Sequence, residues 1–137
     1  MLKGTSARIA AIGFALLSVG GSAIAEDGDA ARGERVFQYC FSCHSVDPNE
    51  QTPLEGPSLY HILGRPTAAL PGFNYSDAMS KRGTGGLKWD ARTLNAYIAD
   101  PQAIVPGTRM SAAPLRDDQA RADLIAYLAK SGLSAVT

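Results

Sequence analysis

Apolar residues recur at helical spacing in three stretches of the chain, and no stretch alternates as a β-strand would. The apolar face of the first stretch, residues 29–40, consists of Gly33, Val36, Phe37 and Cys40. Asp29 stands where a helix N-cap is expected. A glycine inside a helix costs about 1 kcal/mol relative to alanine. Gly33 is therefore either tolerated or allows another helix to cross close to the backbone.

Two further helices are predicted in the C-terminal half of the chain. One spans residues 90–100 and is stopped by Pro101. The other begins at Asp117 or Asp118 and ends at Gly132, because glycine commonly follows the last helical turn. With no convincing strand, the pattern predicts an all-α fold.

The segments between these helices are expected to be irregular. Residues 45–55 are polar and interrupted by prolines, and residues 58–65 form a short helical turn or an irregular apolar segment. Residues 67–88 are predicted as one long, glycine-rich loop. Structureless loops of this length are uncommon in compact domains unless they have a function, such as wrapping around a flat cofactor.

The N-terminus has the features of a secretory signal peptide. Lys3 and Arg8 precede and flank an apolar run, which ends near Ala23-Ile24-Ala25. The apolar run is shorter than the roughly 20 residues of a membrane-spanning helix. We therefore predict a cleavable signal peptide over residues 1–25 and a single exported, periplasmic domain over residues 26–137. The alternative is a membrane tether formed by an uncleaved N-terminus.

The charge balance argues against a nucleic-acid-binding protein. The chain has 13 Lys and Arg and 13 Asp and Glu, and loss of residues 1–25 would remove two basic residues, leaving a net charge of −2. Nucleic-acid-binding domains usually have a clustered basic face. A single domain of this size has a limited core, and a bound cofactor would supply interior apolar surface.

The motif Cys40-Phe41-Ser42-Cys43-His44 contains both cysteines of the chain. Two cysteines separated by two residues and followed by a histidine are typical of c-type haem attachment. On one helical turn both thiols can form thioethers to haem, and His44 can ligate the iron from the proximal side. The motif predicts one covalently bound haem c.

Three other interpretations of the two cysteines are less favourable. A thiol–disulfide oxidoreductase would have a strand before Cys40, and the preceding residues are helical in pattern. A structural zinc site would need all of Cys40, Cys43, His44 and His61, the only such ligands in the chain. A plain disulfide would leave the adjacent His44 unexplained.

The sixth position of the iron has three candidates: His61, Met79 and Met110. Met110 lies in a turn-rich loop far from His44 in sequence, and Met79 lies in the glycine-rich loop. Spacing favours Met110 only slightly. A haem-ligating histidine donates its other ring N–H to an acceptor, and the carbonyl of Pro57 is a candidate for His44.

Beyond the haem motif, the region from about Asp29 to Ser131 resembles the class I cytochromes c, of the mitochondrial and soluble bacterial electron-carrier type. The matching segments are Gly33-x-x-x-Phe37, Gly56-Pro57-Ser58-Leu59, Gly64-Arg65, Pro71 to Ala78, Trp89, Pro106-Gly107-Thr108-Arg109-Met110 and Asp123 to Leu128. The resemblance implies three main helices, short helical turns and long loops wrapped around one haem c.

The resemblance also implies roles for individual residues. Met110 corresponds to the distal iron ligand, and Pro57 to the acceptor for the proximal histidine. The expected haem-propionate partners are Tyr75, Trp89 and Arg65, and the expected hydrogen-bonding residues around the distal methionine are Tyr97 and Thr108. Gly33, Phe37 and Tyr127 match the crossing of the first and last helices.

The implied function is one-electron transfer between redox proteins, without catalysis. The expected partners are a transient donor and a transient acceptor, the expected state is a monomer, and contact with a membrane would be indirect, through membrane-bound partners. Two departures affect the surface: Tyr39 replaces a lysine of the mitochondrial members, and Ala112 stands where an aromatic residue often covers the distal side. The alternative function is a haem protein with a labile distal site that binds small ligands or acts on peroxide.

Overall fold

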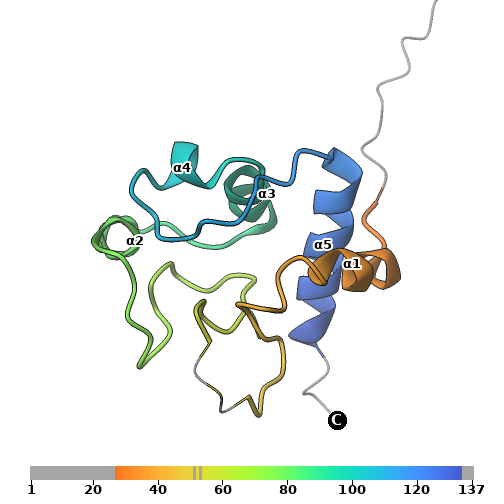
Figure 1. Cartoon of the computed structure of the whole chain (residues 1–137), viewed down its shortest axis with the longest axis horizontal. Helices are drawn as coiled ribbons and strands as arrows, with labels where there is room; N and C mark the ends of the chain where they lie inside the picture. Colours follow the sequence, from red (N-terminus) through yellow and green to blue (C-terminus); the bar gives the residue numbers. More distant parts are fainter. Residues whose placement is uncertain (1–26, 51, 53, 134–137) are drawn as a thin grey trace, which may run out of the picture.

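The computed structural model describes residues 27–50, 52 and 54–133. Within these ranges the chain forms five helices: α1 (Ala30–Phe37), α2 (Asp77–Thr84), α3 (Ala91–Ala99), α4 (Pro101–Ile104) and α5 (Asp118–Ser131) (Figure 1). The same residues contain no β-strand, only an isolated bridge between Pro66 and Lys88. The predicted all-α class is confirmed. The predicted signal peptide over residues 1–25 lies outside the described residues and stays a prediction.

Helices α1 and α5 cross at one side of the molecule, with α2 at the opposite side (Figure 1). At the crossing, a Cβ atom on Gly33 would lie 2.7 Å from Cβ of Tyr127 and even closer to the backbone carbonyl of Asp123. The rings of Phe37 and Tyr127 pack with their centroids 5.5 Å apart. Gly33 is therefore required for close approach of the two helices, as the second of the two interpretations predicts.

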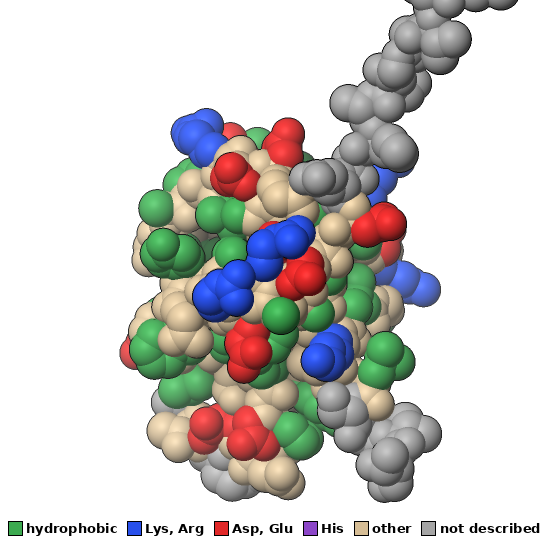
Figure 2. All heavy atoms as spheres, turned by 90° about the vertical axis from the view of Figure 1, so that its right-hand side faces the viewer, with side chains coloured by type: hydrophobic (Ala, Val, Ile, Leu, Met, Phe, Trp, Pro, Cys, Tyr) green, Lys and Arg blue, Asp and Glu red, His purple; other side chains and the backbone are tan. Residues whose placement is uncertain are grey.

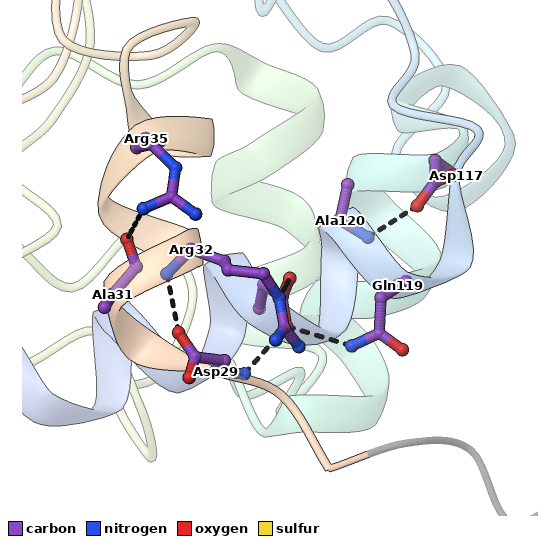
Figure 3. A network of polar contacts seen from close by, with 8 residues as sticks. Asp29, Ala31, Arg32, Arg35, Asp117, Gln119 and Ala120 are labelled. Atoms are coloured by element: carbon purple, nitrogen blue, oxygen red, sulfur yellow. Dashed lines mark hydrogen bonds and ion pairs between the residues drawn. The ribbon is translucent and has the colours of Figure 1, made fainter.

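A buried carboxylate fastens the same crossing. Asp123 of α5 accepts hydrogen bonds from Arg32 Nε at 2.7 Å, Arg32 Nη2 at 2.9 Å, the backbone N–H of Asp29 and the Gln119 amide. Figure 3 shows Arg32 and Gln119 reaching toward the same point between α1 and α5. The Arg32 hydrogen bond is the main reason why the pKa of Asp123 lies well below its ordinary value of 3.8, against the opposing effect of desolvation.

Side-chain caps begin the three predicted helices where expected. Asp29, Asp90 and Asp117 accept from the backbone N–H groups of Arg32, Thr93 and Ala120 respectively. Helix α1 ends at Phe37, not at Cys40, because the chain continues in tighter turns. After Asp100, which caps it, the chain forms the one-turn helix α4.

The prediction of one irregular loop over residues 67–88 is wrong, because α2 lies inside it. Ser76 caps this helix by accepting from the backbone N–H of Met79, whose side chain is buried in the core. Gly83 suits the helix because a Cβ there would collide with the carbonyl of Thr67. The glycine that suggested a loop is a packing requirement of a helix.

The buried core lies between these helices and the loops that connect them. It consists of Phe37, Ile62, Met79, Trp89, Leu94, Tyr97, Val105, Leu124 and Leu128. On the face shown in Figure 2, acidic and basic side chains are interspersed and do not gather into one basic patch. None of the helices in the described ranges is long and apolar enough to cross a bilayer.

Candidate haem-binding site

The two cysteines lie on consecutive turns that continue directly from α1. The carbonyl of Cys40 accepts from the backbone N–H of Cys43 at 3.1 Å and from that of His44 at 2.9 Å. Both thiols are free, with Cys40 half-buried and Cys43 exposed. Burial raises the pKa of the Cys40 thiol, and the neighbouring Cys43 raises it further. This backbone arrangement holds both thiols and the following histidine within one short segment.

His44 is oriented by a single short hydrogen bond. Its Nδ1 donates to the carbonyl oxygen of Pro57 at 2.7 Å, which leaves Nε2 as the nitrogen available to a metal. Burial lowers the pKa of His44 from 6.5, although the bond to Pro57 acts in the opposite direction. A lowered pKa favours the neutral imidazole, the form that binds metals.

Gly56 provides the space for the His44 ring. A Cβ at this position would lie 2.6 Å from Nδ1 and 2.7 Å from Nε2 of His44. The backbone N–H of Gly56 also donates to the carbonyl of Cys43 at 2.8 Å. The sequence does not predict this contact, because its only signal is that Gly56 and Pro57 are adjacent residues with special backbone properties.

Met110 lies at the end of a loop held by polar contacts. The hydroxyls of Tyr97 and Thr108 are 2.7 Å apart in the buried interior, and the same Thr108 oxygen accepts from the backbone N–H of Met110 at 3.3 Å. Burial raises the pKa of Tyr97, against the opposing effect of its hydrogen bond with Thr108. The structure thus brings Tyr97, Thr108 and Met110 together.

Gln102 of α4 also holds this loop, a role that the sequence does not predict. Its amide donates to the carbonyl of Thr108 at 3.2 Å, and its side-chain oxygen accepts from the backbone N–H of Gly107 at 3.0 Å. Gly107 has a φ of +88°, a conformation that glycine adopts readily. Gln102 follows Pro101 in α4, and nothing in its sequence context indicates the bridge.

The three expected propionate partners lie on neighbouring segments. Backbone bonds from Gly64 N–H to the Trp89 carbonyl and from Trp89 N–H to the Arg65 carbonyl place Arg65 beside Trp89. Burial raises the pKa of the Tyr75 phenol, against the opposing effects of its hydrogen bond with Leu70 and the charge of Arg65. The Arg65 guanidinium donates to the carbonyls of Ser58 and Tyr60.

Residues of the proximal and distal sides pack against the same apolar core. Cys40, Tyr75 and Met110 are partly buried against a core that includes Trp89 and Tyr97. The donor chemistry suits haem c: two thiols, an imidazole oriented through Nδ1 and a half-buried thioether. The residues present therefore fit this cofactor.

The other candidates for the sixth ligand lie in different environments. Met79 is 8% exposed and packs in the core from α2, which corrects the expectation that it lies in the glycine-rich loop. His61 is exposed, and its ring lies edge-on to that of Tyr60. No three His, Cys, Asp or Glu side chains gather as a metal site among residues 27–50, 52 and 54–133. That part of the chain offers no four-ligand set for zinc.

Comparisons with known proteins agree on one family. The family model described as cytochrome c matches residues 30–132. The chain is 43% identical to cytochrome c2 of Rhodomicrobium vannielii over 122 residues, which cover 89% of this chain and 93% of that protein. It is also 41% identical to cytochrome c type-1 of Ascaris suum, covering 74% of this chain and 88% of the relative.

Solved structures lead to the same conclusion. Cytochrome c2 of Rhodospirillum centenum matches with a TM-score of 0.70 and 35% identity, covering 75% of this chain and 98% of that structure. Cytochrome cH of Methylobacterium extorquens matches with a TM-score of 0.67 and 36% identity, over 75% and 99% of the two chains. The chain therefore belongs to the cytochrome c family, and it is an electron carrier with one covalently bound haem c.

Proposed function

We propose that this chain is a periplasmic one-electron carrier in which Cys40 and Cys43 hold the haem and His44 and Met110 ligate its iron. The observation that carries the proposal is the 2.7 Å hydrogen bond from His44 Nδ1 to Pro57, which directs Nε2 of a residue adjacent to Cys43 toward a metal. The Tyr97–Thr108 pair beside Met110 supports the distal assignment.

Bound haem supplies reversible one-electron chemistry at its iron. The protein's contribution is to hold the two iron ligands, exclude water and lower the reorganisation energy of electron transfer. Pro57 fixes the orientation of His44, and Thr108 fixes the backbone of Met110. Arg65, Tyr75 and Trp89 are proposed to neutralise and hydrogen-bond the propionates.

If His44 and Met110 both ligate the iron, no position on it would remain for a substrate. We therefore propose a carrier and not an enzyme. The partners are a redox donor and a redox acceptor that bind transiently, as small electron-transfer interfaces do. Tyr39, which is 80% exposed directly before Cys40, gives this side of the molecule an aromatic contact where mitochondrial relatives carry lysine. We expect a monomer that meets membranes only through such partners.

Acid–acetone extraction of the purified protein tests the covalent attachment. The haem of the unmodified chain should stay with the protein, whereas the double variant Cys40→Ser/Cys43→Ser should release it. Ser42→Ala, at one of the two exposed positions between them, is the matched control and should retain haem. Release of haem from the unmodified protein would refute the proposed attachment.

Mass measurement of the exported protein tests the localisation. A mature chain that begins at Glu26 and is recovered in the periplasmic fraction is the expected result. A membrane-bound chain that retains residues 1–25 would replace this proposal with the tethered alternative.

A further inference from the structure

Helix α5 contains a buried arginine, Arg121. Arg121 is 6% exposed, and its guanidinium donates to acceptors from three segments. Nε donates to the Asn95 side-chain oxygen at 2.9 Å, Nη1 to the backbone carbonyl of Leu115 at 2.7 Å, and Nη2 to the carboxylate of Asp118. A buried charge is costly unless its hydrogen-bonding capacity is satisfied. Here each of the three guanidinium nitrogens of Arg121 has an acceptor.

Leu115 ends the segment that runs on from Met110, which we call the distal strap (residues 111–115). Residues 111–114 are exposed, and Leu115 is half-buried against the core. The backbone N–H of Leu115 donates to the carbonyl of Ile98 in α3 at 3.0 Å. Leu115 therefore binds α3 through its N–H and α5 through its carbonyl, the second bond being made by Arg121.

The two ends of the distal methionine segment are thus fastened by different residues. Before Met110, the chain is held by Tyr97 and Gln102 through contacts with Thr108. After Met110, the exposed part of the strap is followed by the paired bonds of Leu115. We expect movement of Met110 away from the core to break the hydrogen bonds on one side of it or the other.

We infer that Arg121 is a positioning residue for Met110, which it acts on through the carbonyl of Leu115. The inference rests on the proposed function, in which Met110 is the distal iron ligand. The neutral acceptors on Asn95 and Leu115 are the important partners, because the side chain of Asp118 is 92% exposed and its ion pair is open to solvent. The planar guanidinium can reach both acceptors at fixed geometry, which an ammonium group cannot do.

Cyanide binding to the ferric protein measures the opening of the strap. Cyanide reaches the iron only after Met110 has left, so its association rate reports how often the distal segment opens. Arg121→Lys keeps the positive charge but loses the planar guanidinium, and Arg121→Ala loses both. We expect cyanide association to become at least about tenfold faster in Arg121→Lys and faster still in Arg121→Ala, since a hydrogen bond from a charged donor is lost.

Two controls separate this role from general destabilisation. Asp118→Asn removes the exposed ion pair and should leave cyanide association within about twofold of the unmodified rate. Phe37→Leu loosens the α1–α5 crossing, away from the strap, and serves as a variant of reduced thermal stability. It should also stay close to the unmodified rate under conditions where the protein is folded.

Either of two results would overturn the inference. An unchanged cyanide association rate in Arg121→Lys would show that the guanidinium of Arg121 does not hold the distal strap. Equal acceleration in Arg121→Lys and Phe37→Leu would show a general loss of stability. If Arg121→Ala does not fold, Arg121→Lys and Asn95→Ala carry the test. The variant Met110→Ala distinguishes failure of the proposed function from failure of this inference. If the thioether-to-iron charge-transfer band persisted in that variant, Met110 would not be the distal ligand.

Discussion

The proximal and distal sides of the site are built in different ways. On the proximal side, the thiols and the imidazole lie within Cys40–His44, and one hydrogen bond to Pro57 and one close contact with Gly56 complete the arrangement. On the distal side, Met110 is held by a chain of contacts to Tyr97, Gln102 and Thr108. These residues come from two helices and a loop.

This difference has a physical consequence. The proximal residues are fixed by local backbone geometry and would also be tied covalently to the haem, so little can move there. The distal ligand depends on several moderate contacts, each of which contributes about 1 kcal/mol. We therefore expect the distal side to open first, and single substitutions there to loosen it gradually. Steric changes on the proximal side should act more abruptly.

The largest effect is expected from Gly56→Ala. The added Cβ would lie 2.6 Å from His44 Nδ1, so the ring or the Gly56-Pro57 turn has to move. Overpacking of this kind costs up to about 3 kcal/mol. Most of the haem-containing product should be lost, as measured by covalent haem per purified chain and by thermal unfolding.

Gly85→Ala is the matched control for this substitution. Its added Cβ would lie 3.3 Å from the Lys81 carbonyl and 3.4 Å from the Arg82 carbonyl, distances that need only small adjustments. If both alanine variants retained the same amount of haem, the close contact at Gly56 would not matter for the proximal side.

Thr108→Val should loosen the distal side by about 1–2 kcal/mol, because the buried Tyr97 hydroxyl and the Met110 N–H both lose a partner. Chemical denaturation measures this cost. The double variant Thr108→Val/Tyr97→Phe should cost less than the two single changes combined, since no unpaired phenol remains. Strict additivity would mean that the two hydroxyls are not coupled.

Asp123→Asn tests a part of the fold that both sides share. Because the pKa of Asp123 is depressed in the folded protein, its stabilising contribution is complete above the unfolded value of 3.8 and is lost as the pH falls below it. The unmodified protein should therefore lose thermal stability more steeply than Asp123→Asn below about pH 4. Asp27→Asn makes the same charge change at an exposed position, and equal pH profiles for all three proteins would contradict the prediction.

Phe41→Ser should have the smallest effect on stability. Phe41 lies between the cysteines but is 58% exposed, and surface substitutions usually change the free energy of unfolding by less than about 0.5 kcal/mol. Thermal unfolding of the haem-containing protein measures this. A large loss of thermal stability in Phe41→Ser would show that the proximal side depends on more than Cys40, Cys43, His44 and their contacts.

Local signals in the sequence account for much of the frame. Asp29, Asp90 and Asp117 are recognisable as caps because an N-cap acts on residues two or three positions away. The haem motif is equally local. The sequence does not predict α2, because its interior Gly83 is typical of a loop. Glycine is needed there because the backbone of Thr67 packs against it, a tertiary contact.

The distal side is harder to predict for the same reason. Spacing alone leaves Met79, Met110 and His61 as candidates, and only the resemblance to a family selects Met110. Burial of Met79 depends on core residues distant in sequence, and the Thr108 hydroxyl beside Met110 is paired with Tyr97 of α3. Gln102 carries no local signal, because it binds backbone groups of Gly107 and Thr108 whose positions only the folded chain defines. The same holds for the contacts of Arg121 with the Asn95 side chain and the Leu115 carbonyl.

The ferric absorption spectrum of Met110→Ala tests the central claim most directly. The unmodified protein should show the weak charge-transfer band of a thioether bound to ferric haem, and Met110→Ala should lack it while keeping covalent haem on acid–acetone extraction. Met79→Leu, a conservative change in the core, should retain the band. Persistence of the band in Met110→Ala, or its loss in Met79→Leu, would contradict the assignment of Met110 as the distal ligand.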